Sequence, residues 1–262
     1  MAAVTIRVGH SADPDDAFMV WALEAGRVDL RGLQLTPVVS DIQTLNEWAL
    51  AARLEVTALS AGAYPAAADR YLLLPHGASF GEGYGPIVVA REEVDLREVE
   101  IVTPGPLTTA TRVLKLALGD DLRTRDLPFD QVLDEVVSGR AEAGLLIHEG
   151  QLTYAGSGLR KLLDLGVWWQ DETELPLPLG LVAARRDLAR LGDVSAVLRE
   201  AIDVALANRE EAMAYAMGFG RGIDAATADE FVAMYVNDLT LDMGDRGREA
   251  IALLLGFEPE FL

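Results

Sequence analysis

Apolar and polar residues follow two different periods along the first part of the chain. Short apolar runs predict strands over 4–9, 33–40 and 56–60. Between them, helical spacing predicts helices over 14–25 and 41–54. Pro37 within the second run favours an edge strand or a bend. This alternating order of strands and helices predicts a parallel sheet with right-handed crossovers.

The same alternation restarts in the middle of the chain. The strands predicted there are 85–91, 99–105, 143–149 and 175–185. The helices predicted there are 108–118 and 129–138, and the acidic stretch 92–98 could form a crossover. From residue 186 to residue 262 nearly every segment has helical spacing. A second strand–helix unit is therefore inserted into the first.

The pattern predicts an α/β protein of two lobes with a cleft between them. Residues 1–91 and 180–262 are expected to form the first lobe, including the helical tail, and residues 92–179 the inserted second lobe. The chain should cross between the lobes near Arg91 and near Pro178. Ligands of such folds bind in the crevice at the carboxyl ends of the parallel strands.

Composition narrows the classes of partner. The chain of 262 residues has a net charge of −20, which disfavours nucleic acid and anionic membrane surfaces. It has no cysteine, so disulfides and thiolate chemistry are excluded. No apolar run reaches the ~20 residues of a membrane span, and the start MAAVTIRVGH does not resemble a secretory signal. A cytoplasmic protein is expected, and a homodimer is one option that the sequence allows.

His148 gives the strongest single indication of chemistry. It ends the apolar run GLLIH, and the carboxyl end of a strand in an open α/β sheet faces the ligand crevice. An imidazole there could take or give a proton near neutral pH. A structural histidine, hydrogen-bonded at a strand end, fits the same pattern equally well.

The other histidines and the acidic loop HSADPDD give weaker indications of function. A solvated loop position is favoured for His10, and His76 suggests no function. The three histidines are isolated in sequence and do not resemble a metal site, and the loop lacks the spacing of a calcium loop. Asp13, Asp15 and Asp16 are interpreted as capping and dipole-compensating residues of the helix that follows.

The segment TPGPLTTAT predicts an anion site. A strand runs into a turn and then into a helix that begins with hydroxyl residues, where free N–H groups and the side chains of Thr108 and Thr109 could bind a carboxylate. Thr108 acting only as a helix cap is the simpler alternative. Ser11 and Ser60, at the ends of two first-lobe strands, would face the same crevice.

Aromatic residues offer a further contact for a ligand. Trp168, Trp169 and Tyr154 could pack against an aromatic molecule, and a structural cluster beside the hinge is an equally good interpretation.

These motifs resemble the 1,4-dihydroxy-6-naphthoate synthase family of the futalosine route to menaquinone. The matching segments run in order from residue 9 to residue 180 and include GHSADPDDAF, TLNEWAL, ALSAGAY, GYGPIVVAR, PGPLTTA, GLLIHEGQLTY and DLGVWWQDETELPLPLG. The pair IHEGQLTY and LPLPLG is the most specific part of the resemblance.

The resemblance implies a fold like that of type II periplasmic binding proteins and an enzyme that acts on an anionic aromatic or polycyclic carboxylate. It implies conversion of cyclic dehypoxanthine futalosine to 1,4-dihydroxy-6-naphthoate, chemistry that requires neither metal nor cofactor. In this family His148 matches the proton acceptor. The segments that match its substrate contacts are Ala58, Leu59 and Ser60, and Thr108, Thr109 and Ala110.

Two departures from the family pattern keep alternatives open. The family loop often reads SPCPND where this chain has SADPDD, which places Asp13 and Asp15 near the expected anion site. The residue before Leu-Ser is basic in some members and is Ala58 here. A non-catalytic protein that binds a small carboxylate, and a chorismate dehydratase of the same pathway, are the alternatives.

Overall fold

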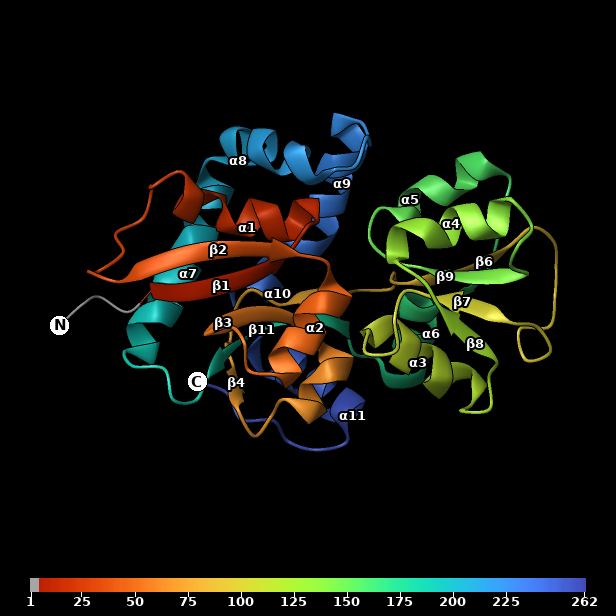
Figure 1. Ribbon diagram of the computed structural model, residues 1–262, viewed down its shortest axis with the longest axis horizontal. Coiled ribbons are helices and arrows are strands. Elements are labelled where there is room, and N and C mark those ends of the chain that lie inside the picture. Colours follow the sequence, from red (N-terminus) through yellow and green to blue (C-terminus); the bar gives the residue numbers. More distant parts are fainter. Residues whose placement is uncertain (1–4) are drawn as a thin grey trace.

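The computed structural model describes residues 5–262 and contains two separate β-sheets (Figure 1). The first sheet has the strand order β2 (Gln34–Ser40), β1 (Thr5–Ser11), β3 (Val56–Ser60), β11 (Leu177–Arg185) and β4 (Tyr71–Leu73), with β5 (Ser79–Gly81) also paired to β11. The second has the order β10 (Arg160–Asp164), β6 (Ile87–Ala90), β9 (Ala143–Leu146), β7 (Ile101–Thr103) and β8 (Thr124–Asp126). We call the parts built on these sheets the first and second lobes.

The start of the first lobe follows the predicted strand–helix order. Strand β1 pairs in parallel with β2 and with β3. Pro37 lies in β2, at the edge of the sheet, where its missing N–H does not interrupt a central ladder. The prediction that the first strand begins at Val4 falls outside the described residues.

Two helices connect these strands. Helix α1 (Pro14–Glu24) follows β1, and α2 (Ile42–Leu50) begins where the Asp41 side chain accepts a hydrogen bond from the Thr44 N–H at 3.0 Å. The helix predicted to reach residue 54 ends earlier, because the chain turns at Ala52 with a φ of 49° before entering β3.

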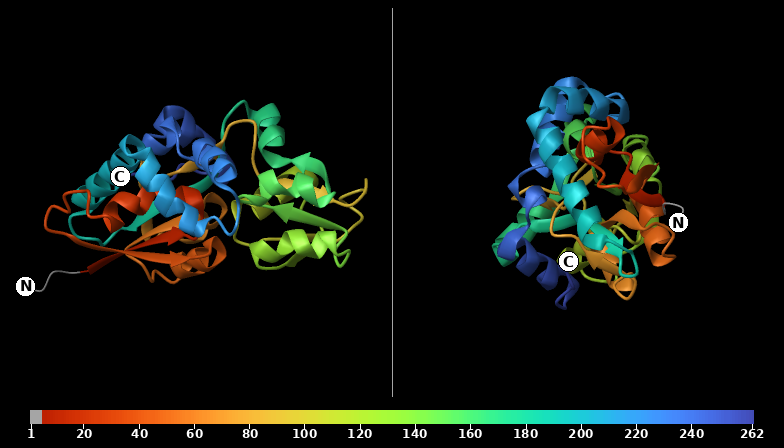
Figure 2. Two further views of the ribbon diagram at one scale, coloured as in Figure 1. Left: turned by 90° about the horizontal axis from the view of Figure 1, so that it is seen from above. Right: turned by 90° about the vertical axis from the view of Figure 1, so that its left-hand side faces the viewer.

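The helical tail packs on the first lobe, as predicted. It comprises α7 (Leu191–Ala207), α8 (Arg209–Ala216), α9 (Ala225–Tyr235), α10 (Asp238–Leu241) and α11 (Gly244–Leu255). Helices α7, α8 and α9 contact α1, and α11 contacts β11. Apolar side chains such as Phe18, Ile202 and Val232 form the core between them. Seen from above, the lobes lie end to end and the tail stays beside the first lobe (Figure 2).

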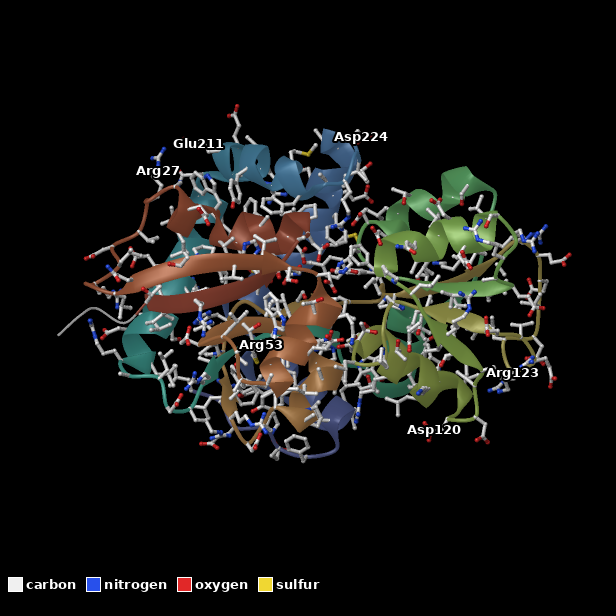
Figure 3. The ribbon with its side chains drawn as sticks, viewed as in Figure 1. Arg27, Arg53, Asp120, Arg123, Glu211 and Asp224 are labelled. Atoms are coloured by element: carbon white, nitrogen blue, oxygen red, sulfur yellow. The ribbon has the colours of Figure 1, made fainter. Side chains whose placement is uncertain are left out.

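The second lobe surrounds its sheet with shorter helices. They are α3 (Thr109–Leu118), α4 (Phe129–Val137), α5 (Gly150–Thr153) and α6 (Leu165–Thr173). Val132 and Val136 of α4 are fully buried against the sheet. Charged side chains such as Arg27, Glu211 and Asp120 lie on the outside of the two lobes (Figure 3).

The first crossing between the lobes comes earlier than predicted. Strand β6 was expected in the first lobe, but it pairs antiparallel with β9 and β10 in the second sheet. The chain therefore crosses between β5 and β6, over residues 82–86, and not near Arg91. A fully buried run shows that a strand is central but does not show which sheet it joins. The return crossing, between α6 and β11, lies just before Pro178.

Candidate functional site

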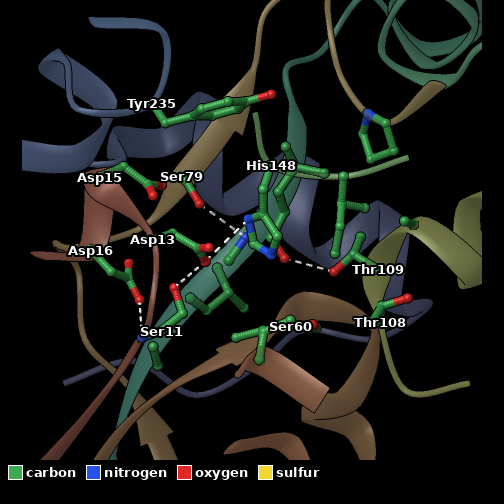
Figure 4. Close-up of a pocket in the computed structure, with 18 of the residues that line it drawn as sticks. Ser11, Asp13, Asp15, Asp16, Ser60, Ser79, Thr108, Thr109, His148 and Tyr235 are labelled. Atoms are coloured by element: carbon green, nitrogen blue, oxygen red, sulfur yellow. Dashed lines mark hydrogen bonds and ion pairs between the residues drawn. The ribbon is translucent and has the colours of Figure 1, made fainter. Parts of the chain in front are cut away.

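A cleft lies between the lobes and is lined by residues of both (Figure 4). Of the residues singled out in the sequence, Ser11, Ala58, Ser60, Thr108, Thr109, Ala110 and His148 line it. Leu59 does not: its side chain is fully buried in the main hydrophobic core. Successive residues of a strand point to opposite faces, so Ala58 and Ser60 face the cleft and Leu59 faces away.

His148 lies two residues beyond the strand that was predicted to include it. Strand β9 ends at Leu146, and His148 has a φ of 53°, in the left-handed region that non-glycine residues seldom occupy. Its side chain is 16% exposed, and the edge of its ring packs against Phe129 with the centroids 4.9 Å apart. The strained turn aims the imidazole into the cleft.

Asp13 orients the imidazole. Its Oδ2 lies 3.1 Å from His148 Nδ1, while His148 Nε2 is buried and has no hydrogen-bond partner among residues 5–262. A carboxylate beside Nδ1 holds the ring proton there, which leaves the lone pair of Nε2 free to accept a proton. Asp13 is the N-cap residue of α1, as predicted, but its side chain forms no cap bond and contacts His148 instead.

The surroundings of Asp13 keep it ionised. Ser11 Oγ donates a hydrogen bond to its Oδ2 at 2.5 Å, and Arg221 binds its Oδ1 at 2.7 Å. Burial alone would raise the pKa of Asp13, but its interactions with His148 and Arg221 and the bond from Ser11 together hold it below its ordinary value.

Arg221 joins the lobes at the edge of this site. Its guanidinium binds both carboxylate oxygens of Glu149, each at 2.7 Å, and lies 4.6 Å from the centre of the Phe129 ring. Burial would lower the pKa of Arg221, but the hydrogen bonds and charges of Glu149 and Asp13 raise it, so the guanidinium stays charged. No pattern in the sequence indicated this loop residue, because its partners are far away along the chain.

The predicted anion turn lies opposite Asp13, at the start of α3. Thr108 caps the helix, and its hydroxyl donates to the Gly105 carbonyl at 2.9 Å. Thr109 Oγ1 donates to the Leu179 carbonyl at 2.6 Å and accepts from the Gly62 N–H at 3.1 Å, so it ties the lobes together. Both hydroxyls are therefore bonded within the protein, and Thr108 Oγ1 also accepts a hydrogen bond from the Thr111 N–H at 3.3 Å.

Ser60 is held in place by a residue that the sequence analysis did not single out. Asn46 of α2 is fully buried; its Oδ1 accepts from the Ser60 N–H at 2.8 Å and its Nδ2 donates to Ser60 Oγ at 3.0 Å. The motif TLNEWAL contained Asn46, but a buried amide cannot be recognised from helical spacing alone.

The remaining candidates are structural. His10 is buried, with Nδ1 2.9 Å from the Ser11 carbonyl oxygen, so its prediction as a solvated loop residue was wrong. His76 Nε2 lies 2.8 Å from Ser195 Oγ, and burial together with the charge of Arg199 lowers the pKa of His76 to about 4. Trp169 is buried in the core and donates to the Pro176 carbonyl at 3.2 Å, away from the cleft.

No group of three or more His, Asp or Glu residues within 5–262 is placed to hold a metal ion. None of the helices in this range has the length and apolar character needed to cross a membrane.

The fold and the interlobe cleft first define a class, the proteins with a periplasmic-binding-protein-like fold. An alkanesulfonate-binding protein from Xanthomonas axonopodis superimposes with a TM-score of 0.66 at 15% identity, over 90% of this chain and 86% of that one. A Candida albicans protein described as having the generic periplasmic binding protein fold gives 0.71 at 12% identity, over 97% and 91%. The predicted fold class is thereby confirmed.

Relatives of higher identity then define the family. A family model described as menaquinone biosynthesis matches residues 6–259. The 1,4-dihydroxy-6-naphtoate synthase of Thermus thermophilus is 40% identical over 252 residues, which cover 95% of this chain and 92% of the relative. The synthase of the same name from Streptomyces coelicolor is 35% identical, with 97% and 93% covered. A solved structure of an Archaeoglobus fulgidus protein gives a TM-score of 0.92 at 46% identity, with 96% of each chain covered.

The chain belongs to the menaquinone biosynthesis family. The resemblance inferred from its motifs is confirmed, and with it a role as an enzyme of menaquinone biosynthesis.

Proposed function

We propose that this enzyme is a carbon–carbon lyase that converts cyclic dehypoxanthine futalosine to 1,4-dihydroxy-6-naphthoate. One observation supports this most strongly: His148 lines the interlobe cleft, its Nε2 has no hydrogen-bond partner among residues 5–262, and Asp13 holds Nδ1. The arrangement is that of a general base ready to accept a proton. The names of the relatives from Thermus thermophilus and Streptomyces coelicolor supply the product.

In the proposed reaction, His148 removes a proton from a carbon next to a carbonyl group. The electron pair of that C–H bond forms an enolate, and a retro-aldol-type cleavage then releases a three-carbon fragment as the ring system becomes aromatic. A cleft bounded by both lobes favours these steps because it holds the base and the substrate close together.

The carboxylate of the substrate is proposed to bind at the start of α3. Thr108, Thr109 and Ala110 line the cleft, and the helix that begins there offers backbone N–H donors together with the positive end of its dipole. This places the anionic end of an aromatic or polycyclic carboxylate against the second lobe and its reacting end near His148.

The test is turnover by the purified protein and by His148→Ala. The wild-type protein should form 1,4-dihydroxy-6-naphthoate from the cyclic futalosine derivative, detected by chromatography and mass spectrometry. Removal of a general base should lower kcat by about 10²–10⁴-fold. Binding of the product should change far less, because the donors at α3 remain. Near-normal turnover by His148→Ala would refute the assigned base, and no product from the wild type would refute the reaction.

A further inference from the structure

Asp15 is a buried carboxyl group that faces the cleft and has no part in the reaction described so far. It lies in the first turn of α1, is 8% exposed, and lines the cleft together with His148 and Tyr235 (Figure 4). Its Oδ1 is buried and has no hydrogen-bond partner among the described residues. A buried polar atom without a partner is available for a hydrogen bond that a ligand brings.

The two neighbouring carboxylates differ from Asp15 in having strong partners. Asp13 is bound by Ser11, His148 and Arg221, and Asp16 Oδ2 accepts the Ser11 N–H at 2.7 Å. Among the described residues that line the cleft there is no Lys or Arg. An ionised Asp15 would therefore be a further buried negative charge without a cation of its own.

The electrostatics favour the neutral form of Asp15. Burial raises the pKa of Asp15 well above its ordinary value, and the negative charges of Asp16 and Asp13 raise it further. The charge of Arg221 does not offset this, because Arg221 is shared between Asp13 and Glu149. Tyr235 is also neutral, since burial raises the pKa of its hydroxyl.

The titratable and charged groups around this part of the cleft come from several elements. They are His10 of β1, Asp13 and Asp16 at the start of α1, His148 and Glu149 after β9, Arg221 before α9, and Tyr235 of α9.

We propose that Asp15 acts as a neutral carboxylic acid whose O–H donates a hydrogen bond to the substrate carbonyl oxygen while His148 removes the adjacent proton. The proton moves to Nε2, the C–H electron pair becomes the enolate double bond, and negative charge develops on the oxygen that Asp15 contacts. A carboxylic acid that its apolar site keeps neutral is an effective donor to such an oxygen. This inference rests on the proposed function.

The first test is the pH dependence of kcat for the wild type, Asp15→Asn and Asp15→Ala. The wild-type rate should fall at alkaline pH as Asp15 ionises. Asp15→Asn keeps a donor that does not ionise, so it should lack this fall. Asp15→Ala should lower kcat by about 10²–10³-fold with a smaller change in KM. A wild-type kcat in Asp15→Ala, or the same alkaline fall in Asp15→Asn, would overturn the proposal.

A second test needs no turnover. Calorimetry would compare binding of 1,4-dihydroxy-6-naphthoate with that of 2-naphthoate, which carries the same carboxylate but no ring oxygens. The wild type and Asp15→Asn should prefer the dihydroxy ligand, and Asp15→Ala should lose most of that preference. Asp16→Asn is the matched control and should keep it. A preference that survives in Asp15→Ala refutes the role of Asp15, whereas failure of both naphthoates to bind the wild type refutes the proposed ligand class.

Discussion

Two helices begin at the cleft, and they differ in the groups that lie at the positive ends of their dipoles. Helix α1 begins with Asp13, Asp15 and Asp16, so the protein's own carboxyl groups occupy the positive end of its dipole. Helix α3 begins with Thr108 and has no acidic residue in its first turn. The first end is occupied by the protein's own carboxyl groups, and the second is the proposed site of the substrate carboxylate, so we expect an anionic substrate to bind in one direction.

The two helix starts also differ in their proposed roles, proton transfer at α1 and ligand binding at α3. The start of α1 holds the groups proposed to handle protons, since Asp13 contacts His148 and Asp15 faces the same space. The start of α3 holds groups that are already hydrogen-bonded across the lobes, through Thr109 to Gly62 and Leu179. Chemistry is therefore assigned to the acidic end and binding to the neutral end, and variants at each end should affect different constants.

Asp13→Asn should disturb the orientation of His148 at the start of α1. An amide cannot hold the proton on Nδ1 of His148 as a carboxylate does, so the imidazole loses its fixed tautomer. We expect kcat to fall by about 10²–10³-fold, at the pH optimum, with little change in product affinity. Stopped-assay kinetics and product titration would measure both. An equal loss in affinity and in kcat would show that Asp13 is a binding residue instead.

Thr108→Asp should make the start of α3 resemble the start of α1. Aspartate caps a helix as well as threonine does, so the fold should persist. A buried negative charge close to the bound carboxylate should weaken product binding by roughly 10²-fold, by the size of the charge repulsion at intermediate dielectric. The uncharged Thr108→Asn is the matched control, because it differs only in charge. Equal affinities in the two variants, measured by calorimetry, would place the carboxylate elsewhere.

Arg221→Lys should weaken the connection between the lobes. A lysine cannot form the paired bonds to Glu149 while also reaching Asp13, so the closed cleft should be populated less. We expect kcat/KM to fall about tenfold, as for other supporting residues of an active site. Arg209→Lys, which alters an exposed pair with Asp229, is the control and should leave kcat/KM unchanged. A loss of equal size in both variants would indicate general destabilisation.

Asp15→Asn should stabilise the protein at neutral pH. Folding raises the pKa of Asp15 above the ordinary 3.8. The contribution of Asp15 to the stability of the fold is therefore fully present below pH 3.8, and it is lost as the pH rises through the pKa of the folded state. Asparagine does not titrate, so the Tm of Asp15→Asn should exceed that of the wild type at pH 7–8, and the difference should shrink as the pH approaches 4. Thermal melts across this range would show the trend. A difference that does not vary with pH would mean that Asp15 does not titrate as described.

Local periodicity predicted most of the fold. The strands and helices of the first lobe, the cap at Thr108 and the packing of the tail follow from patterns within a few turns of chain. The position of β6 could not be predicted in this way, because the sequence of a buried strand does not show which sheet the strand joins. Likewise, β9 ends at Leu146 because His148 adopts a left-handed conformation that apolar spacing does not indicate.

The candidate site was predicted residue by residue only where the chain itself placed the groups at strand or helix ends. His148, Ser60 and Thr109 were found in this way. Asp13 was noticed as an acidic departure but was given a capping role, because its contact with His148 exists only after the lobes meet. Arg221, from a loop in the helical tail, was not predicted, because its place in the site depends wholly on tertiary contacts.

Chemical rescue of His148→Gly tests the central claim most directly. This variant leaves a space the size of an imidazole beside Asp13, and turnover of the cyclic futalosine derivative would be measured as imidazole is added. If a ring nitrogen at this position is the base, imidazole should restore turnover in a saturable manner, and the restored rate should rise with the fraction of neutral imidazole. A variant that turns over at the wild-type rate without imidazole would contradict the account.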